Sequence, residues 1–95
     1  MVSIDWSVIS PDATFADLSG NGITNMNWEN APRSLTKVNL NYNQITNMNW
    51  EHAPRSLTDV NLGDNQITSM NWEHAPRSLS NVYFGNRWCY RWCDR

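Results

Sequence analysis

A 22-residue period runs through the sequence and restricts what the chain can fold into more than any other feature. Trp28, Trp50 and Trp72 recur at this constant spacing, and Pro32 and Pro54 follow in step. Periods of about 20 to 50 residues are typical of solenoids, propellers and arrays, in which each repeat is one small supersecondary unit. The chain is therefore expected to be a stack of similar turns, each covering the core of its neighbours.

The repeat boundaries can be drawn from the sequence, and the whole chain is expected to form one domain over residues 1–95. The units are a partial N-terminal repeat at 1–12, repeats at 13–34, 35–56 and 57–78, and a divergent C-terminal repeat or cap at 79–95. The repeats at 35–56 and 57–78 are nearly identical, so they define the register of the others.

The first eleven positions of each unit read LxxVxLxxNxI, as in Leu35, Val38, Leu40, Asn43 and Ile45, and the pattern recurs in the next unit. This resembles the leucine-rich repeat signature LxxLxLxxNxL. The Pro ahead of each new Leu is similar to the short, Pro-containing repeats of some bacterial and oomycete members. The resemblance implies an α/β-type repeat solenoid of mostly strand and coil, with a short parallel sheet on its concave side and an extended or turn-like convex side.

The residues support this architecture independently. Alternation at Val38 and Leu40 suits a strand with one buried face, and stacked units would bring three to four such strands into a parallel sheet. The segment 50–56 contains a Pro and no apolar helical period, so it is expected to be extended or turn-like. An Asn after each strand can bond to neighbouring backbone groups. The expected structural ladder is Asn21, Asn43 and Asn65.

The differences between repeats gather at strand positions that point away from the core. In leucine-rich repeat proteins this concave face is the usual binding surface, so the resemblance implies recognition of a protein or peptide there. Neutral drift at solvated positions after duplication is the alternative explanation. The candidate binding residues are Phe15, Asp17, Lys37, Asn39, Asn41, Tyr42, Asp59, Asn61, Asp64, Asn81 and Tyr83.

Counting back one period from Trp28 gives Trp6, so the repeat register reaches the first residues with no separate cap. An uncapped solenoid end exposes core residues and strand edges. This favours an alternative function as a structural subunit that stacks through its ends into oligomers or filaments. The end-to-end interface candidates are Ile4, Trp6, Trp88, Arg91 and Trp92.

Each Trp of the repeat precedes a Glu by one residue and an Arg by five, as in Trp50, Glu51 and Arg55. We expect the indole to cover the core while Glu pairs with Arg. The alternative is an exposed aromatic strip for carbohydrate or for another solenoid, which requires the rings to be accessible.

Cys89 and Cys93 are spaced CxxxC near the C-terminus. Zinc sites favour CxxC with a second ligand pair, so no metal site is expected. The two cysteines are candidates for a disulfide, within one chain or between two chains.

Composition and motifs exclude several functional classes. A net charge of −2 leaves no basic field for nucleic acid, and no run of about 18 apolar residues predicts membrane insertion. No nucleophile–base pair or Gly-rich phosphate loop occurs, so neither a catalytic site nor a cofactor is expected. The chain shows no signal peptide, and because a removed leader would leave an extracellular location open, the compartment is not assigned.

Overall fold

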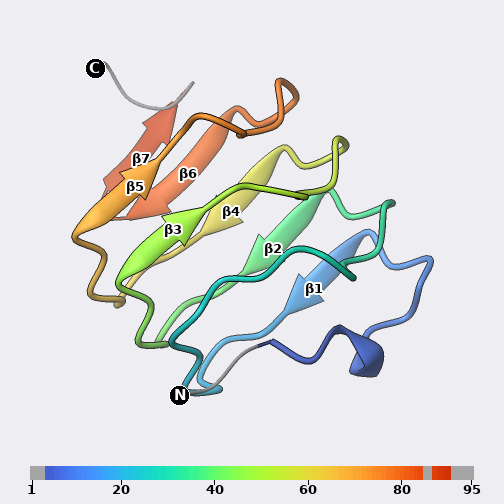
Figure 1. Cartoon of the computed structure of the whole chain (residues 1–95), viewed down its shortest axis with the longest axis horizontal. Coiled ribbons are helices and arrows are strands. Elements are labelled where there is room, and N and C mark those ends of the chain that lie inside the picture. The colour runs from blue at the N-terminus through green and yellow to red at the C-terminus, as the bar shows by residue number, and fades with distance from the viewer. Residues whose placement is uncertain (1–3, 85–86, 91–95) are drawn as a thin grey trace.

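The computed structural model of the chain describes residues 4–84 and 87–90. Within these residues a single turn of 3-10 helix, η1 (Trp6–Val8), is followed by short strands. The strands are β1 (Phe15–Asp17), β2 (Lys37–Asn39), β3 (Asn47–Asn49), β4 (Asp59–Asn61), β5 (Ser69–Asn71), β6 (Asn81–Phe84) and β7 (Arg87–Tyr90). Figure 1 shows the chain winding in successive turns, with equivalent strands side by side.

The larger sheet has the strand order β1-β2-β4-β6-β7, and its first four strands are parallel. Phe15 lies opposite Lys37, and Val38 lies opposite Val60, so strand partners are equivalent positions of successive repeats. One repeat is therefore one turn of the solenoid. The predicted repeat solenoid of strand and coil is confirmed.

The return side of each turn carries a second, two-stranded parallel sheet formed by β3 and β5. Met48, at the centre of β3, is fully buried, while Asn47 and Asn49 on either side of it are exposed. This alternation with a period of two is what a strand requires. The residues that follow Trp50 form two turns, so the expected extended and turn-like segment is also confirmed.

The strand β7 departs from the expected parallel arrangement. It pairs antiparallel with β6, with Asn81 opposite Tyr90 and Phe84 opposite Arg87. In the regular turns the position that Arg87 occupies holds an Asn, such as Asn43, whose amide supports the loop after the strand. The residues equivalent to β7 in the regular turn, 43–46, form a loop, so the chain leaves the repeat register after β6.

The core lies between the two sheets and is lined by the apolar residues of the repeat. Leu35, Leu40, Ile45 and Leu57 are all fully buried, as is Met48 from the second sheet. Burial of a side chain of this size contributes about 1.5–3 kcal/mol. Among residues 4–84 and 87–90, no helix is long and apolar enough to cross a membrane.

The tryptophans form a continuous stack along the solenoid. The ring centroids of Trp6 and Trp28 are 5.8 Å apart, those of Trp28 and Trp50 are 5.9 Å apart, and those of Trp50 and Trp72 are 5.8 Å apart. Phe84 continues the stack at 6.4 Å from Trp72, with its ring tilted by 54°. Because Trp28 and Trp50 are at most 1% exposed, the column is part of the core and not an accessible aromatic strip.

Indole nitrogens tie successive turns together. Nε1 of Trp6 donates to the carbonyl of Asn27 at 2.6 Å, and Nε1 of Trp28 donates to the carbonyl of Asn49 at 2.9 Å. The same nitrogen of Trp50 is buried and has no hydrogen-bond partner. The stack therefore combines apolar burial with a hydrogen bond that satisfies the polar end of the indole in its first two turns.

Candidate functional site

The outer face of the five-stranded sheet, the face turned away from the core, carries the varied strand residues. The inward positions of β1, β2, β4 and β6 are buried apolar residues, so the residues on either side of each point outward. Strand register aligns these outward positions in two columns. The first column is Phe15, Lys37, Asp59 and Asn81, and the second is Asp17, Asn39, Asn61 and Tyr83.

A shallow hollow of about 250 Å³ lies over β1, β2 and β4 on this outer face. It is lined by Phe15, Lys37, Val38, Asn39, Asp59 and Asn61. Phe15 is 56% exposed, and Lys37 is also exposed. Asp59 accepts a hydrogen bond on Oδ2 from Nδ2 of Asn81 at 3.2 Å, which holds its carboxylate over the sheet.

Residues of the second column also stabilise the turns that follow the strands, in addition to any binding role. Oδ1 of Asp17 accepts hydrogen bonds from the backbone N–H and hydroxyl of Ser19, and these bonds lower the pKa of the Asp17 carboxyl. Oδ1 of Asn39 accepts from the backbone N–H two residues on, and Asn61 does the same. Each residue thus forms an Asx turn that ends its strand.

The loop that follows each strand holds a residue in the left-handed region of backbone space. Gly20 has φ 67°, Tyr42 has φ 57° and Asp64 has φ 55°, at equivalent positions of three turns. A residue with a Cβ in this region costs about 1–2 kcal/mol. Tyr42 is nevertheless 65% exposed, and its backbone N–H donates to the carbonyl of Gly63 at 3.0 Å. The strained backbone therefore presents an aromatic side chain to solvent.

The remaining candidates on this face are more enclosed. Asn41 has a buried Oδ1 without a hydrogen-bond partner. A Cβ on Gly63 would lie 2.9 Å from that oxygen and 2.9 Å from Cε2 of Tyr83. The Tyr83 ring thus covers Gly63, and the two residues are packed together with Asn41.

The predicted Asn ladder occupies the loops at the end of the strands. Asn43 is 5% exposed, accepts from the backbone N–H groups of Asn21 and Ile23, and donates to the carbonyls of Leu18, Leu40 and Asn41. Asn65 makes the equivalent donations one turn later and accepts from Ile45. Asn21 is exposed in the first turn.

The expected pairing of Glu with Arg on the return side is wrong. Arg33 donates from Nε to the carbonyl of Ala31 at 3.1 Å and from Nη2 to the carbonyls of Trp28 and His52, at 3.2 and 2.9 Å. Arg55 likewise donates from Nη2 to His74 at 3.1 Å. Among the residues described, no ion pair joins an Arg of this column to a Glu. Backbone carbonyls lie closer to the guanidinium and satisfy it without ordering an exposed Glu side chain.

Sequence reasoning missed a second column of turns, which lies just ahead of the tryptophans. Oδ1 of Asn27 accepts from the backbone N–H two residues on, and Asn49 and Asn71 repeat this contact. Asp5 occupies the same position in the first turn and accepts from Ser7, which lowers the pKa of Asp5. The recurrent Asn–Trp pair was the signal that could have predicted this column.

The candidates for an end-to-end interface are distributed unevenly. Ile4 and Trp6 are 8% and 5% exposed, so both belong to the core. Trp88 and Cys89 lie in β7. The other calls on this end, Arg91, Trp92 and Cys93, lie outside the residues that the structure describes.

No group of three or more metal-ligating side chains gathers within residues 4–84 and 87–90. No curated protein and no solved structure matches the chain. A family model described as leucine-rich repeat matches residues 31–47 and 53–69, which are equivalent segments of two successive turns. These matches and the parallel solenoid support a leucine-rich repeat family for the chain.

Proposed function

We propose that the chain is a non-enzymatic recognition module that binds a short extended peptide on the outer face of its five-stranded sheet. Leucine-rich repeats generally mediate interactions between proteins, and solenoids use an extended sheet face for this purpose. The observation that carries the proposal is the hollow over β1, β2 and β4, with the exposed Phe15 and the cationic Lys37 on its rim.

The chemistry of the hollow favours a ligand with both apolar and acidic groups. Phe15 offers an aromatic surface that loses contact with water on binding, and aromatic residues are enriched in binding hot spots. Lys37 is the cation of the hollow and pairs best with a carboxylate of the ligand. Asp59 and Asn81 hold each other through a hydrogen bond and provide a polar boundary.

The size of the face favours a peptide over a folded surface. Each strand has only three or four residues, and neighbouring strands are about 4.8 Å apart. Five strands therefore span about 20 Å, with a usable length of about 10 Å along each strand. A stable interface between folded proteins takes about 800 Å² from each partner, several times more than this face offers.

The test begins with selection of binding peptides from a random phage-displayed library against the full chain. The affinity of a selected peptide is then measured by calorimetry for the wild type, Phe15→Ala and Lys37→Glu. Each substitution should weaken binding by about tenfold or more. The matched controls are Val8→Ala, which removes another exposed apolar side chain, and Arg77→Glu, which reverses an exposed cation on the return side.

Unchanged affinity in both Phe15→Ala and Lys37→Glu would refute binding on the outer face. Self-assembly through the ends is the alternative function, and it has less support because Ile4 and Trp6 are buried. Sedimentation velocity over about a hundredfold range of concentration distinguishes the two. Growth into larger species, with no peptide selected, would favour self-assembly.

A further inference from the structure

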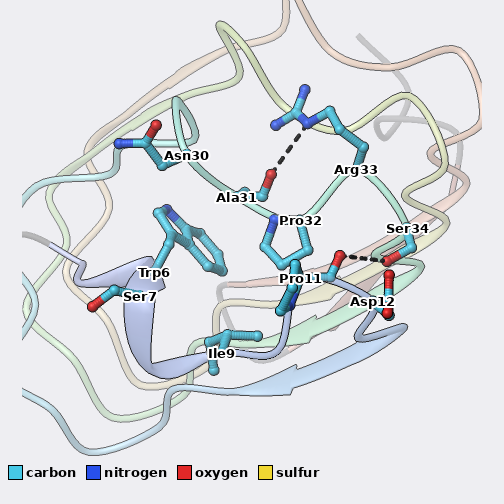
Figure 2. Close-up of a pocket in the computed structure, with 10 residues that line it drawn as sticks. All are labelled: Trp6, Ser7, Ile9, Pro11, Asp12, Asn30, Ala31, Pro32, Arg33 and Ser34. Atoms are coloured by element: carbon cyan, nitrogen blue, oxygen red, sulfur yellow. Dashed lines mark hydrogen bonds between the residues drawn. The ribbon is translucent and has the colours of Figure 1, made fainter.

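A cavity lies away from the outer face, between the first turn and the second. It has a volume of about 730 Å³ and is lined by Trp6, Ser7, Ile9, Pro11, Asp12, Asn30, Ala31, Pro32, Arg33 and Ser34. Figure 2 shows Trp6 and Ile9 on one side and Asn30 to Ser34 opposite them. It shares no lining residue with the hollow over the sheet.

The repeat explains why a cavity opens at this place. Pro11 is the equivalent of Arg33 in the preceding repeat, and Arg55 is its equivalent in the following one. Arg33 spans the gap to the next turn by donating to the carbonyl of His52, and Arg55 does so by donating to His74. Pro11 has no such group, and among the described residues nothing donates to the carbonyl of Asn30, the equivalent of His52. The first turn therefore lacks the guanidinium that bridges the later turns.

The backbone that surrounds a guanidinium in the later turns is retained around the cavity. The backbone N–H of Ala13 donates to the carbonyl of Ser10 at 3.0 Å. The equivalent hydrogen bond in the next repeat runs from Leu35 to the carbonyl of Pro32, at 3.4 Å. The carbonyl of Trp6 accepts from Ile9, as the carbonyl of Trp28 accepts from Ala31. The acceptors that Arg33 uses in the second turn thus have counterparts in the first.

The first turn also differs in charge from the later turns, in the direction that favours binding of a cation. Asp12 stands where the later turns have Ser34 and Ser56, so the site has lost an arginine and gained a carboxylate. Arg33 is the other charged residue of the lining. Its guanidinium is held by carbonyls of its own turn and the next, and Figure 2 shows it turned toward Ala31, on the far side from Pro11 and Asp12.

We propose that this cavity binds the guanidinium of an arginine side chain supplied by a partner protein. The planar guanidinium would donate to the carbonyl of Asn30 and pair with the carboxylate of Asp12, as charge-assisted hydrogen bonds. The side chain's methylene groups would pack on Ile9 and Pro11. The bound guanidinium would then extend the column formed by Arg33 and Arg55 by one turn.

The experiment titrates the full chain with N-acetyl-arginine N-methylamide and follows backbone and indole N–H signals by NMR. The lysine and citrulline analogues serve as probes of shape and charge, since citrulline keeps the planar group without its charge. We expect shifts at Trp6 and Asn30 with the arginine compound, and about tenfold weaker binding or none with the other two. A peptide with a central arginine should bind more tightly than the single amino acid, which distinguishes a protein ligand from a free guanidino compound.

Two variants make the site falsifiable. Pro11→Arg should fill the cavity with the chain's own guanidinium, because Arg33 occupies the equivalent position of the next repeat, and should abolish binding while raising the melting temperature. Asp12→Asn should weaken binding by about tenfold. The matched control is Glu73→Gln, which removes an exposed carboxylate from the return side of a later turn and should leave binding unchanged.

Three results would overturn the proposal. These are binding of citrulline as tightly as arginine, full binding by Pro11→Arg, or equal losses in Asp12→Asn and Glu73→Gln. None of them bears on the outer face, which is tested by the substitutions of Phe15 and Lys37. The two sites can therefore fail independently.

Discussion

Replacement of Asn43 by Ala tests the idea that one buried amide holds together the loops of two turns. The side chain makes five hydrogen bonds to backbone groups. Its oxygen accepts from two N–H groups of the preceding turn. Its nitrogen donates to one carbonyl of the preceding turn and to two carbonyls of the turn that contains Asn43. It is 5% exposed, so water does not readily replace the lost partners. The substitution leaves these backbone groups to find partners elsewhere or remain unpaired.

The magnitude follows from the number of groups affected. Each lost hydrogen bond contributes a net of about 0.5–1.5 kcal/mol, and a buried group left unpaired costs more. With partial relaxation of the loop, Asn43→Ala should lower the free energy of unfolding by about 3–5 kcal/mol. That is a large share of the roughly 5–15 kcal/mol that stabilises a domain of ordinary size.

The assay is urea denaturation followed by far-ultraviolet circular dichroism, with comparison of midpoints and m-values. Asn21→Ala is the matched control, because this residue occupies the same repeat position but is exposed, and it should cost less than about 0.5 kcal/mol. A loss below about 1 kcal/mol in Asn43→Ala, or equal losses in both variants, would refute the reasoning.

The remaining predictions concern the outer face. Tyr42→Gly should be about 1 kcal/mol more stable than Tyr42→Ala, because the left-handed φ of 57° penalises a Cβ and Gly20 already fills the equivalent position; equal urea midpoints would contradict this. Gly63→Ala should destabilise the fold by about 1–3 kcal/mol and shift the NMR signals of Tyr83, because the added Cβ lies 2.9 Å from its ring; an unperturbed ring would show that the loop adapts. The pKa of Asp17 is lowered in the folded chain, so the contribution of this carboxylate to stability is present at neutral pH and is lost as pH falls below about 4. NMR titration of this carboxyl in the wild type should show the depressed pKa. An ordinary pKa would contradict the Asx turn.

Much of the solenoid follows from the repeat alone. The constant period places Val38 opposite Val60 and stacks Trp28 on Trp50 whatever the details of the loops. The alternation of Val38 and Leu40 determines which side chains face inward, because successive side chains of a strand point to opposite faces. The Asn after the strand has the right length and hydrogen-bonding groups to bridge two turns.

The candidate binding surface was predictable only in outline. Register allowed Phe15, Lys37 and Asp59 to be placed in one outward column. That Asn39 also forms an Asx turn depends on the backbone direction just after the strand, which spacing does not specify. The strain at Tyr42 depends likewise on a backbone angle.

The amino-acid sequence alone determined the repeat, the alignment of each turn with the next and the inward-facing residues. These depend only on the 22-residue period of the chain and on the alternation of side chains along a strand. Tertiary structure decided the antiparallel β7, the burial of Ile4 and Trp6, and the choice of Arg33 for carbonyls over a nearby Glu. It also opened the cavity beside Pro11. These features depend on distances between atoms of adjacent turns, where several partners compete for one group and only three-dimensional packing selects among them.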